Sequence, residues 1–200
     1  MKFEIMIILV MAVLNRFVCL NSEKTIFSFE CLIQNGQYGF ELLYDSDEMT
    51  NLNRSISTPF VYPLKYLTNS NKVRWILEAT NDSNSLDIVS LKSYSSNKYL
   101  CASSHHLDRF KLRRIVYLSN YFEKEACEWK LEKVISKSNQ DEDQLGMRSY
   151  ITNVKYNEPL YAASYFFKKD QFKRNPYLWH NEKEKFKSKQ FEWMIECSIF

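Results

Sequence analysis

The sequence predicts an all-β fold in which three copies of a four-stranded unit give twelve strands. The main observation is a repeated segment in which Trp is followed by two mainly apolar residues and then Glu, at 73–78, 127–132 and 191–196. Strand-forming residues are abundant, with 14 Phe, 13 Tyr and 4 Trp. No stretch has helical apolar spacing over several turns, and the nearest candidate, Lys183–Lys189, has the alternating charge of a solvated loop.

A second repeated segment lies upstream of each Trp and predicts the first strand of each unit. Val89–Tyr94 matches Leu145–Tyr150 without gaps, and Phe27–Leu32 fits the same pattern more loosely. The first, third and often the fifth positions are apolar or small. This two-residue period is typical of a strand that buries one face.

A third repeated segment predicts the second strand of each unit. Asn97–Ser103 matches Glu158–Ser164 in this alignment, and Gln37–Glu41 is a weaker counterpart in the first copy. Turns in this chain must be made mainly by Asn, Ser and Asp, because it has only three Gly.

A fourth segment predicts the third strand. Asp108–Lys111 matches Asp170–Lys173, and in both copies the Phe precedes another aromatic residue, Tyr117 or Trp179, by seven positions. Phe60–Tyr62 takes this place in the first copy. Each copy therefore reads strand, turn, strand, polar loop, strand, loop, strand, and the copies cover about 25–80, 85–134 and 143–200.

Three copies of such a unit resemble the β-trefoil superfamily. The likeness is carried best by Val89–Ser103, a short apolar strand, a polar turn and then Tyr-Leu-Cys-Ala, which is similar to the units of fascin-like, ricin-B-like and fibroblast-growth-factor-like proteins. It covers nearly all of the chain after residue 25. The Gln-x-Trp motif of ricin-B lectins is absent, since Val73, Cys127 and Phe191 stand two residues before the Trp positions. The alternatives are an incomplete barrel and a β-sandwich.

The N-terminus resembles a secretory signal peptide over residues 1–22. One Lys precedes an uncharged apolar run at Ile5–Leu14, and cleavage is expected between Cys19 and Glu23. The run is too short to span a bilayer. We therefore expect a secreted, extracellular protein with a single domain over 23–200. An uncleaved anchor or a core strand is the alternative.

Cysteine content agrees with secretion. Four cysteines remain after the signal peptide, and the sequence alone allows three pairings. The trefoil resemblance implies one pairing, because the first and last strands of that fold are neighbours. It joins Cys31 to Cys197 and Cys101 to Cys127, and the alternative is four free buried thiols. Two sequons, at Asn53 and Asn81, predict glycosylation.

Catalysis and metal binding are not expected. The three histidines are His105, His106 and His180, and no metal-binding spacing, catalytic Cys or Gly-rich phosphate loop accompanies them. We expect these histidines to lie in solvated loops. The sequence therefore predicts a binding protein with no enzymatic activity, no cofactor and no metal.

Basic clusters and one Trp are the candidate ligand-binding residues. They are Arg109, Lys111, Arg113, Arg114, Lys168, Lys169, Lys173, Arg174 and Trp179. A positive surface concentrates anionic glycans or acidic extracellular proteins, and basic residues late in fibroblast-growth-factor-like trefoils bind heparin, so the resemblance implies a similar use here. The alternative is that Lys-rich loops keep the protein in solution. We expect a monomer with no nucleic-acid partner and no membrane span.

Two other binding functions stay open. A lectin would repeat an aromatic residue and a polar set in each copy, whereas only Asp108 and Asp170 repeat. A protease inhibitor would present a long loop, and 45–58 and 136–144 are the candidates.

Overall fold

A computed structural model describes residues 28–46, 48, 57–79, 87–134, 146–166, 170–180 and 188–198. These residues form twelve strands, as predicted. The segment assigned to a signal peptide, both sequons, Lys168 and Lys169 lie outside the described residues, as does most of the two long loops.

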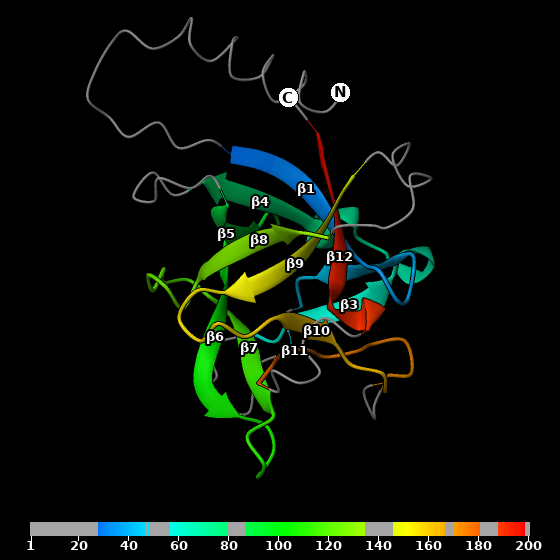
Figure 1. Ribbon diagram of the computed structural model, residues 1–200. Coiled ribbons are helices and arrows are strands. Elements are labelled where there is room, and N and C mark those ends of the chain that lie inside the picture. Colours follow the sequence, from blue (N-terminus) through cyan, green and yellow to red (C-terminus); the bar gives the residue numbers. More distant parts are fainter. Residues whose placement is uncertain are drawn as a thin grey trace, which may run out of the picture.

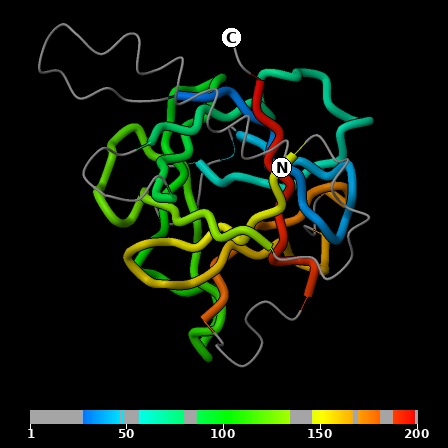
Figure 2. Tube along the Cα trace, turned by 45° about the horizontal axis from the view of Figure 1, so that its top comes forward, coloured from blue at the N-terminus to red at the C-terminus, as the bar shows by residue number. Residues whose placement is uncertain are grey.

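Six strands close into a barrel. They are β1 (Ser28–Asn35), β4 (Arg74–Ala79), β5 (Ile88–Ser93), β8 (Glu128–Lys133), β9 (Met147–Asn153) and β12 (Glu192–Ser198). Each pairs antiparallel with the next in this order, and β12 pairs with β1. The first and last strands of the described chain therefore lie side by side (Figures 1 and 2).

Three hairpins cap one end of the barrel. They are β2 (Glu41–Tyr44) with β3 (Phe60–Pro63), β6 (Tyr99–His106) with β7 (Arg113–Ser119), and β10 (Leu160–Ala162) with β11 (Pro176–Trp179). Short 3-10 helices, η1 (Leu64–Tyr66), η2 (Ser70–Val73) and η4 (Lys189–Phe191), lead into later strands. Backbone pairing links the hairpins in a ring, through Ser57 with Leu118, Arg114 with Leu178 and Arg174 with Val61.

The repeated Trp residues close the core in the same way in every copy. Trp75, Trp129 and Trp193 are fully buried. Their indole nitrogens donate to backbone oxygens in the second strand of their own copy, at 2.9, 2.9 and 3.1 Å. The acceptors are Leu43, Leu100 and Leu160. The Trp repeat is therefore part of the scaffold.

Barrel pairing corrects the alignment of the first strands. Trp75 lies opposite Ser93, Trp129 opposite Asn153 and Trp193 opposite Asn35. These partners are equivalent, so the match of Val89 with Leu145 was displaced by four residues. A displacement of four keeps every side chain on the predicted face, because the strand period is two.

The second strand was displaced by one residue. The Trp acceptors make Leu100 equivalent to Leu160, whereas the sequence alignment set Leu100 against Tyr161. An odd displacement exchanges the buried and exposed faces. In the hairpins, Leu100 pairs with Leu118 and Leu160 with Leu178.

Trp179 therefore does not take the place of Tyr117. The hairpin pairing makes Tyr177 the counterpart of Tyr117 and Ser119 the counterpart of Trp179. The preceding turns do match as predicted, because the Asp108 and Asp170 carboxylates both accept the backbone N–H of the Phe two residues later. The two copies differ in the number of residues between turn and strand.

Both predicted disulfides are present. Cys31 and Cys197 are direct cross-strand partners in β1 and β12, 166 residues apart in sequence. Cys101 in β6 joins Cys127 just before β8, 26 residues away. The first bond follows from closure of the barrel, which brings the two ends of the domain together.

Candidate functional site

Two of the predicted ligand-binding cations are buried in ion pairs. Arg114 and Arg174 are each only 7% exposed. Arg114 pairs with Glu158, and Arg174 pairs with Glu41. The four residues join neighbouring copies of the repeat.

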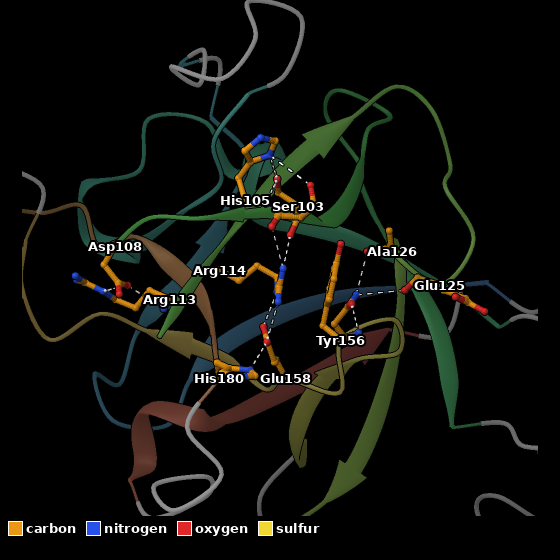
Figure 3. Close-up of polar contacts among 12 residues, drawn as sticks. Ser103, His105, Asp108, Arg113, Arg114, Glu125, Ala126, Tyr156, Glu158 and His180 are labelled. Carbon is orange, nitrogen blue, oxygen red and sulfur yellow. Dashed lines mark hydrogen bonds and ion pairs between the residues drawn. The ribbon is translucent and has the colours of Figure 1, made fainter. Parts of the chain in front are cut away.

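The Arg114 guanidinium contacts a carboxylate, two backbone oxygens and an aromatic ring (Figure 3). Its Nε and Nη2 donate to the two carboxylate oxygens of Glu158 at 2.7 and 3.0 Å, and Nη1 donates to the backbone oxygens of Ser103 and Ser104 at 3.2 Å. The guanidinium carbon lies 3.6 Å from the ring centre of Tyr156. His180 Nδ1 lies 2.8 Å from Glu158 Oε1. A bidentate, stacked arginine of this kind is committed to the scaffold.

Arg174 occupies the equivalent place between the third and first copies. Its Nε donates to Glu41 Oε2 at 2.8 Å and its Nη1 to the Ser164 backbone oxygen at 2.8 Å. The guanidinium lies between the rings of Tyr38 and Phe166, at 3.8 and 4.0 Å from their centres. Burial raises the pKa of Glu41 from its ordinary value, although the hydrogen bond and charge of Arg174 act in the opposite direction.

The third equivalent contact is a single hydrogen bond in place of an ion pair. Lys98 stands where the other copies have Glu, and its Nζ donates to the Ser57 hydroxyl at 3.2 Å. Ser57 stands where the other copies have Arg, as the ring of backbone pairs between the hairpins shows. Sequence analysis missed these pairs because their members are far apart along the chain.

The other predicted cations that the structure describes differ in whether they form ion pairs. Arg113 pairs with Asp108, and Lys173 pairs with Glu48 and Asp170. Arg109 and Lys111 are exposed, and neither forms an ion pair with another described residue. The basic loops therefore offer fewer free charges than their composition suggests.

Trp179, the one aromatic residue among the candidate ligand-binding residues, is half-buried. Its ring packs 5.2 Å from that of Tyr161. Its indole nitrogen is buried without a hydrogen-bond partner among the described residues.

The histidines are close to the polar cluster of Figure 3 without forming a metal site. His105 Nδ1 lies 3.2 Å from the Ser103 hydroxyl. Burial lowers the pKa of His106 from its ordinary value, and the charge of Arg114 lowers it further. In the described part of the chain, no three His, Cys, Asp or Glu side chains gather closely enough to hold a metal ion.

A pocket of about 570 Å³ lies next to the Glu41–Arg174 pair, and we call it the aromatic pocket. Four of its lining side chains are large, apolar and exposed: Phe40, Leu64, Tyr66 and Phe166. The rest of the lining is Tyr38, Gly39, Glu41, Pro63, Lys65 and Phe172. The pocket combines the first hairpin with the loop of the third, so its walls come from opposite ends of the chain.

Phe40, in the lining of this pocket, combines high exposure with an unfavourable backbone conformation. It is 76% exposed, and its φ is 53°, in the left-handed region that β-carbons disfavour. The equivalent residues are Asn97 and Asn157, at φ 61° and 52°, because each of the three stands three positions before the Leu that accepts the Trp hydrogen bond. Asn tolerates this conformation far better than an aromatic residue. The correct alignment of the copies would have revealed this exchange in the sequence.

Around Arg114, three described residues at positions equivalent to this wall have polar side chains. Asn157, His106 and His180 stand there where the aromatic pocket has Phe40, Phe166 and Pro63. The shared ion pair therefore supports two surfaces with different chemistry.

No helix in the described residues is long and apolar enough to cross a membrane. No protein-family model and no curated protein sequence matches the chain.

Solved structures, in contrast, match over most of the chain. The SDF2-like protein from Arabidopsis thaliana has a TM-score of 0.62 at 12% identity, covering 86% of this chain and 94% of its own. A BEL β-trefoil has a TM-score of 0.53 at 14% identity, covering 91% of this chain and 99% of its own. This chain has the β-trefoil fold. The Polyporus squamosus lectin, solved with a sialylated glycan, has a TM-score of 0.54 at 10% identity. The match covers 87% of this chain and 50% of the lectin chain. Identities this low establish the fold alone.

Proposed function

We propose that this trefoil is a non-catalytic, lectin-type binding protein that takes a glycan in the aromatic pocket. The observation that carries the proposal is Phe40. An exposed aromatic side chain at a left-handed backbone position lowers the stability of the free protein, and the other two copies avoid it with Asn. We infer that the Phe40 side chain offsets this loss by contacting a ligand.

The chemistry of the pocket suits a sugar ring. A pyranose has an apolar face of C–H groups and a rim of hydroxyls. Phe40, Tyr66 and Phe166 offer aromatic surface, and Glu41 and Lys65 add polar groups to the lining. Lys65 lies over the Tyr66 ring, 4.8 Å from its centre, and forms no ion pair with another described residue. Because the Glu41 and Arg174 charges offset each other, Lys65 leaves the pocket positive, which favours an acidic sugar.

The similarity to a lectin supports the same function as a fold-level analogy. The Polyporus squamosus structure contains the glycan Neu5Acα2-6Galβ1-4GlcNAc, whose first sugar is acidic. Two disulfides favour an oxidising, extracellular setting, where such glycans are displayed. The pocket is a better candidate than the basic loops, since Arg114 and Arg174 are committed to ion pairs.

A glycan array tests the proposal with the native protein and three variants. Phe40→Asn should weaken binding by about tenfold through lost apolar contact, while stabilising the fold by about 1 kcal/mol through relief of backbone strain. Lys65→Gln should weaken binding to acidic glycans and spare neutral ones. Tyr121→Asn, at a side chain that is 84% exposed and does not line the pocket, is the control and should leave binding unchanged.

Two results would reject this function. One is an array on which the native protein binds no glycan. The other is glycan binding that Phe40→Asn leaves intact while thermal unfolding shows the expected stabilisation, because the variant would then be folded and its pocket irrelevant.

A further inference from the structure

The second hairpin is longer than the other two and ends in a turn that exposes two apolar side chains. β6 has eight residues and β7 seven, whereas the strands of the other hairpins have three or four. Its end projects beyond the rest of the cap, at the bottom of Figure 1. Leu107 and Phe110 are in this turn and are 50% and 68% exposed. We call residues 107–111 the hairpin tip.

Asp108 holds the tip in one conformation. Its Oδ1 accepts the backbone N–H groups of Phe110 and Leu112 at 3.1 and 3.2 Å. Its Oδ2 accepts the backbone N–H and the Nε of Arg113 at 2.9 and 3.1 Å. Figure 3 shows the Asp108 and Arg113 side chains turned toward each other. The acid of the tip is thus occupied internally, and the apolar residues are displayed on a preformed turn.

The remaining charges of the tip are positive. Arg109 and Lys111 flank Phe110 in sequence and are exposed. The Arg109 guanidinium lies 4.7 Å from the Phe110 ring centre. Neither cation pairs with a carboxylate among the residues that the structure describes. Two apolar side chains and two free cations therefore share one projecting turn.

We propose that the hairpin tip docks on an anionic lipid surface. Leu107 and Phe110 enter the boundary between headgroups and acyl chains, and Arg109 and Lys111 contact lipid phosphates. Such a surface satisfies the apolar and the charged side chains together. A sulfated glycan would bind the two cations and leave both apolar side chains in water. The tip residues do not line the aromatic pocket, so the two proposals are independent.

Vesicle co-sedimentation tests the docking. The native protein should bind vesicles of phosphatidylcholine with phosphatidylserine more tightly than vesicles of phosphatidylcholine alone. The difference should shrink as salt is added, because exposed charges are screened. Soluble heparin in place of vesicles is the arm that detects a preference for sulfated glycan.

Variants locate the contact. Phe110→Ser should lower the apparent affinity by about tenfold through lost insertion. Arg109→Gln and Lys111→Asn should each lower it by about fivefold on anionic vesicles only. Asn is chosen at 111 because φ there is 57°. Tyr121→Ser, at an exposed aromatic residue outside the tip, is the control and should bind like the native protein.

A local reporter separates insertion from simple adsorption. Phe110→Trp should shift its emission to the blue on anionic vesicles. The proposal is overturned by absence of vesicle binding, by equal binding to neutral and anionic vesicles, by unchanged affinity in all tip variants, or by binding to heparin alone.

Discussion

At the scale of single residues, the copies keep one role while changing the side chain that performs it. Asn35 and Asn153 end equivalent strands, and their Nδ2 atoms donate to backbone oxygens of Gln190 and Ala126 at 3.0 and 2.9 Å. The second copy has Ser93 there, and its hydroxyl donates to Asp45 of the first copy at 2.5 Å. The shorter Ser side chain meets a carboxylate from the preceding copy in place of a backbone oxygen.

The Asp108 carboxyl makes the free energy of unfolding depend on pH in the acidic range. Burial alone would raise its pKa, but the N–H of Leu112 and the side chain and N–H of Arg113 outweigh burial and lower the pKa below its ordinary value. A carboxyl with a lowered pKa in the folded state stabilises the fold above its unfolded pKa of about 4. This stabilisation is lost as the pH falls through the folded pKa.

We expect Asp108→Asn to remove that acid-sensitive contribution. The free energy of unfolding, measured in urea, should fall by about 1–2 kcal/mol at neutral pH because charge-assisted bonds are lost. It should also decline less steeply than that of the native protein below a pH of about 4. Asp170→Asn is the matched control in the equivalent turn and should cost less, since its carboxylate accepts one backbone N–H and contacts Lys173. Parallel pH profiles for the native protein and Asp108→Asn would contradict this account.

At the scale of elements, the fourth strand of each copy is fixed to the second by an indole. The three buried Trp residues make the same hydrogen bond to a buried Leu carbonyl. The fully buried indoles fill the space between barrel and cap, so each strand is held by packing and by a directional bond. The fourth Trp has no such bond, since the Trp179 nitrogen lacks a partner among described residues.

Replacement of each Trp by Phe should reveal this difference. Trp75→Phe, Trp129→Phe and Trp193→Phe should each lower the free energy of unfolding by about 2–4 kcal/mol, through a lost donor and a cavity. Trp179→Phe should change it by less than about 1 kcal/mol, because the buried indole nitrogen makes no hydrogen bond to a described residue that could be lost. Equilibrium denaturation measures all four. A neutral effect at any of the three repeated positions would show that the copies are not held alike.

At the scale of the whole molecule, closure of the barrel and the disulfides act together. The Cys31–Cys197 bond spans 166 residues and joins the strands that close the barrel, whereas Cys101–Cys127 spans 26 residues within one copy. Cross-linking a longer loop removes more conformational entropy from the unfolded chain. The chain-entropy relation gives about 5 kcal/mol for the first bond and about 3.5 kcal/mol for the second.

The paired variants Cys31→Ser/Cys197→Ser and Cys101→Ser/Cys127→Ser should therefore differ in stability. The first should lose about 1–2 kcal/mol more than the second, measured by urea unfolding under non-reducing conditions. An equal loss, or a larger loss for the second pair, would mean that native-state strain or residual unfolded structure outweighs loop length.

The sequence alone predicted the repeat, the twelve strands and, through the trefoil resemblance, both disulfides. These features depend on local pattern: alternating apolar residues, Trp at regular intervals and an even set of cysteines. The alignment between copies was less secure, because short strands of similar composition match at more than one displacement. In the second strand, a displacement of one between the second and third copies and of three in the first copy concealed that Phe40 stands where the other copies have Asn97 and Asn157.

Only the tertiary structure decided which charged and aromatic residues are available to a ligand. Arg174 meets Glu41 across 133 residues of sequence, and Arg114 meets Glu158 across 44, so composition counted as free charges what closure of the cap buries as ion pairs. The same closure brings Phe40, Tyr66 and Phe166 to one pocket from both ends of the chain. The sequence determined the scaffold because strand periodicity and core Trp residues act locally. The candidate site arises between copies, where position depends on how the three units pack around the barrel.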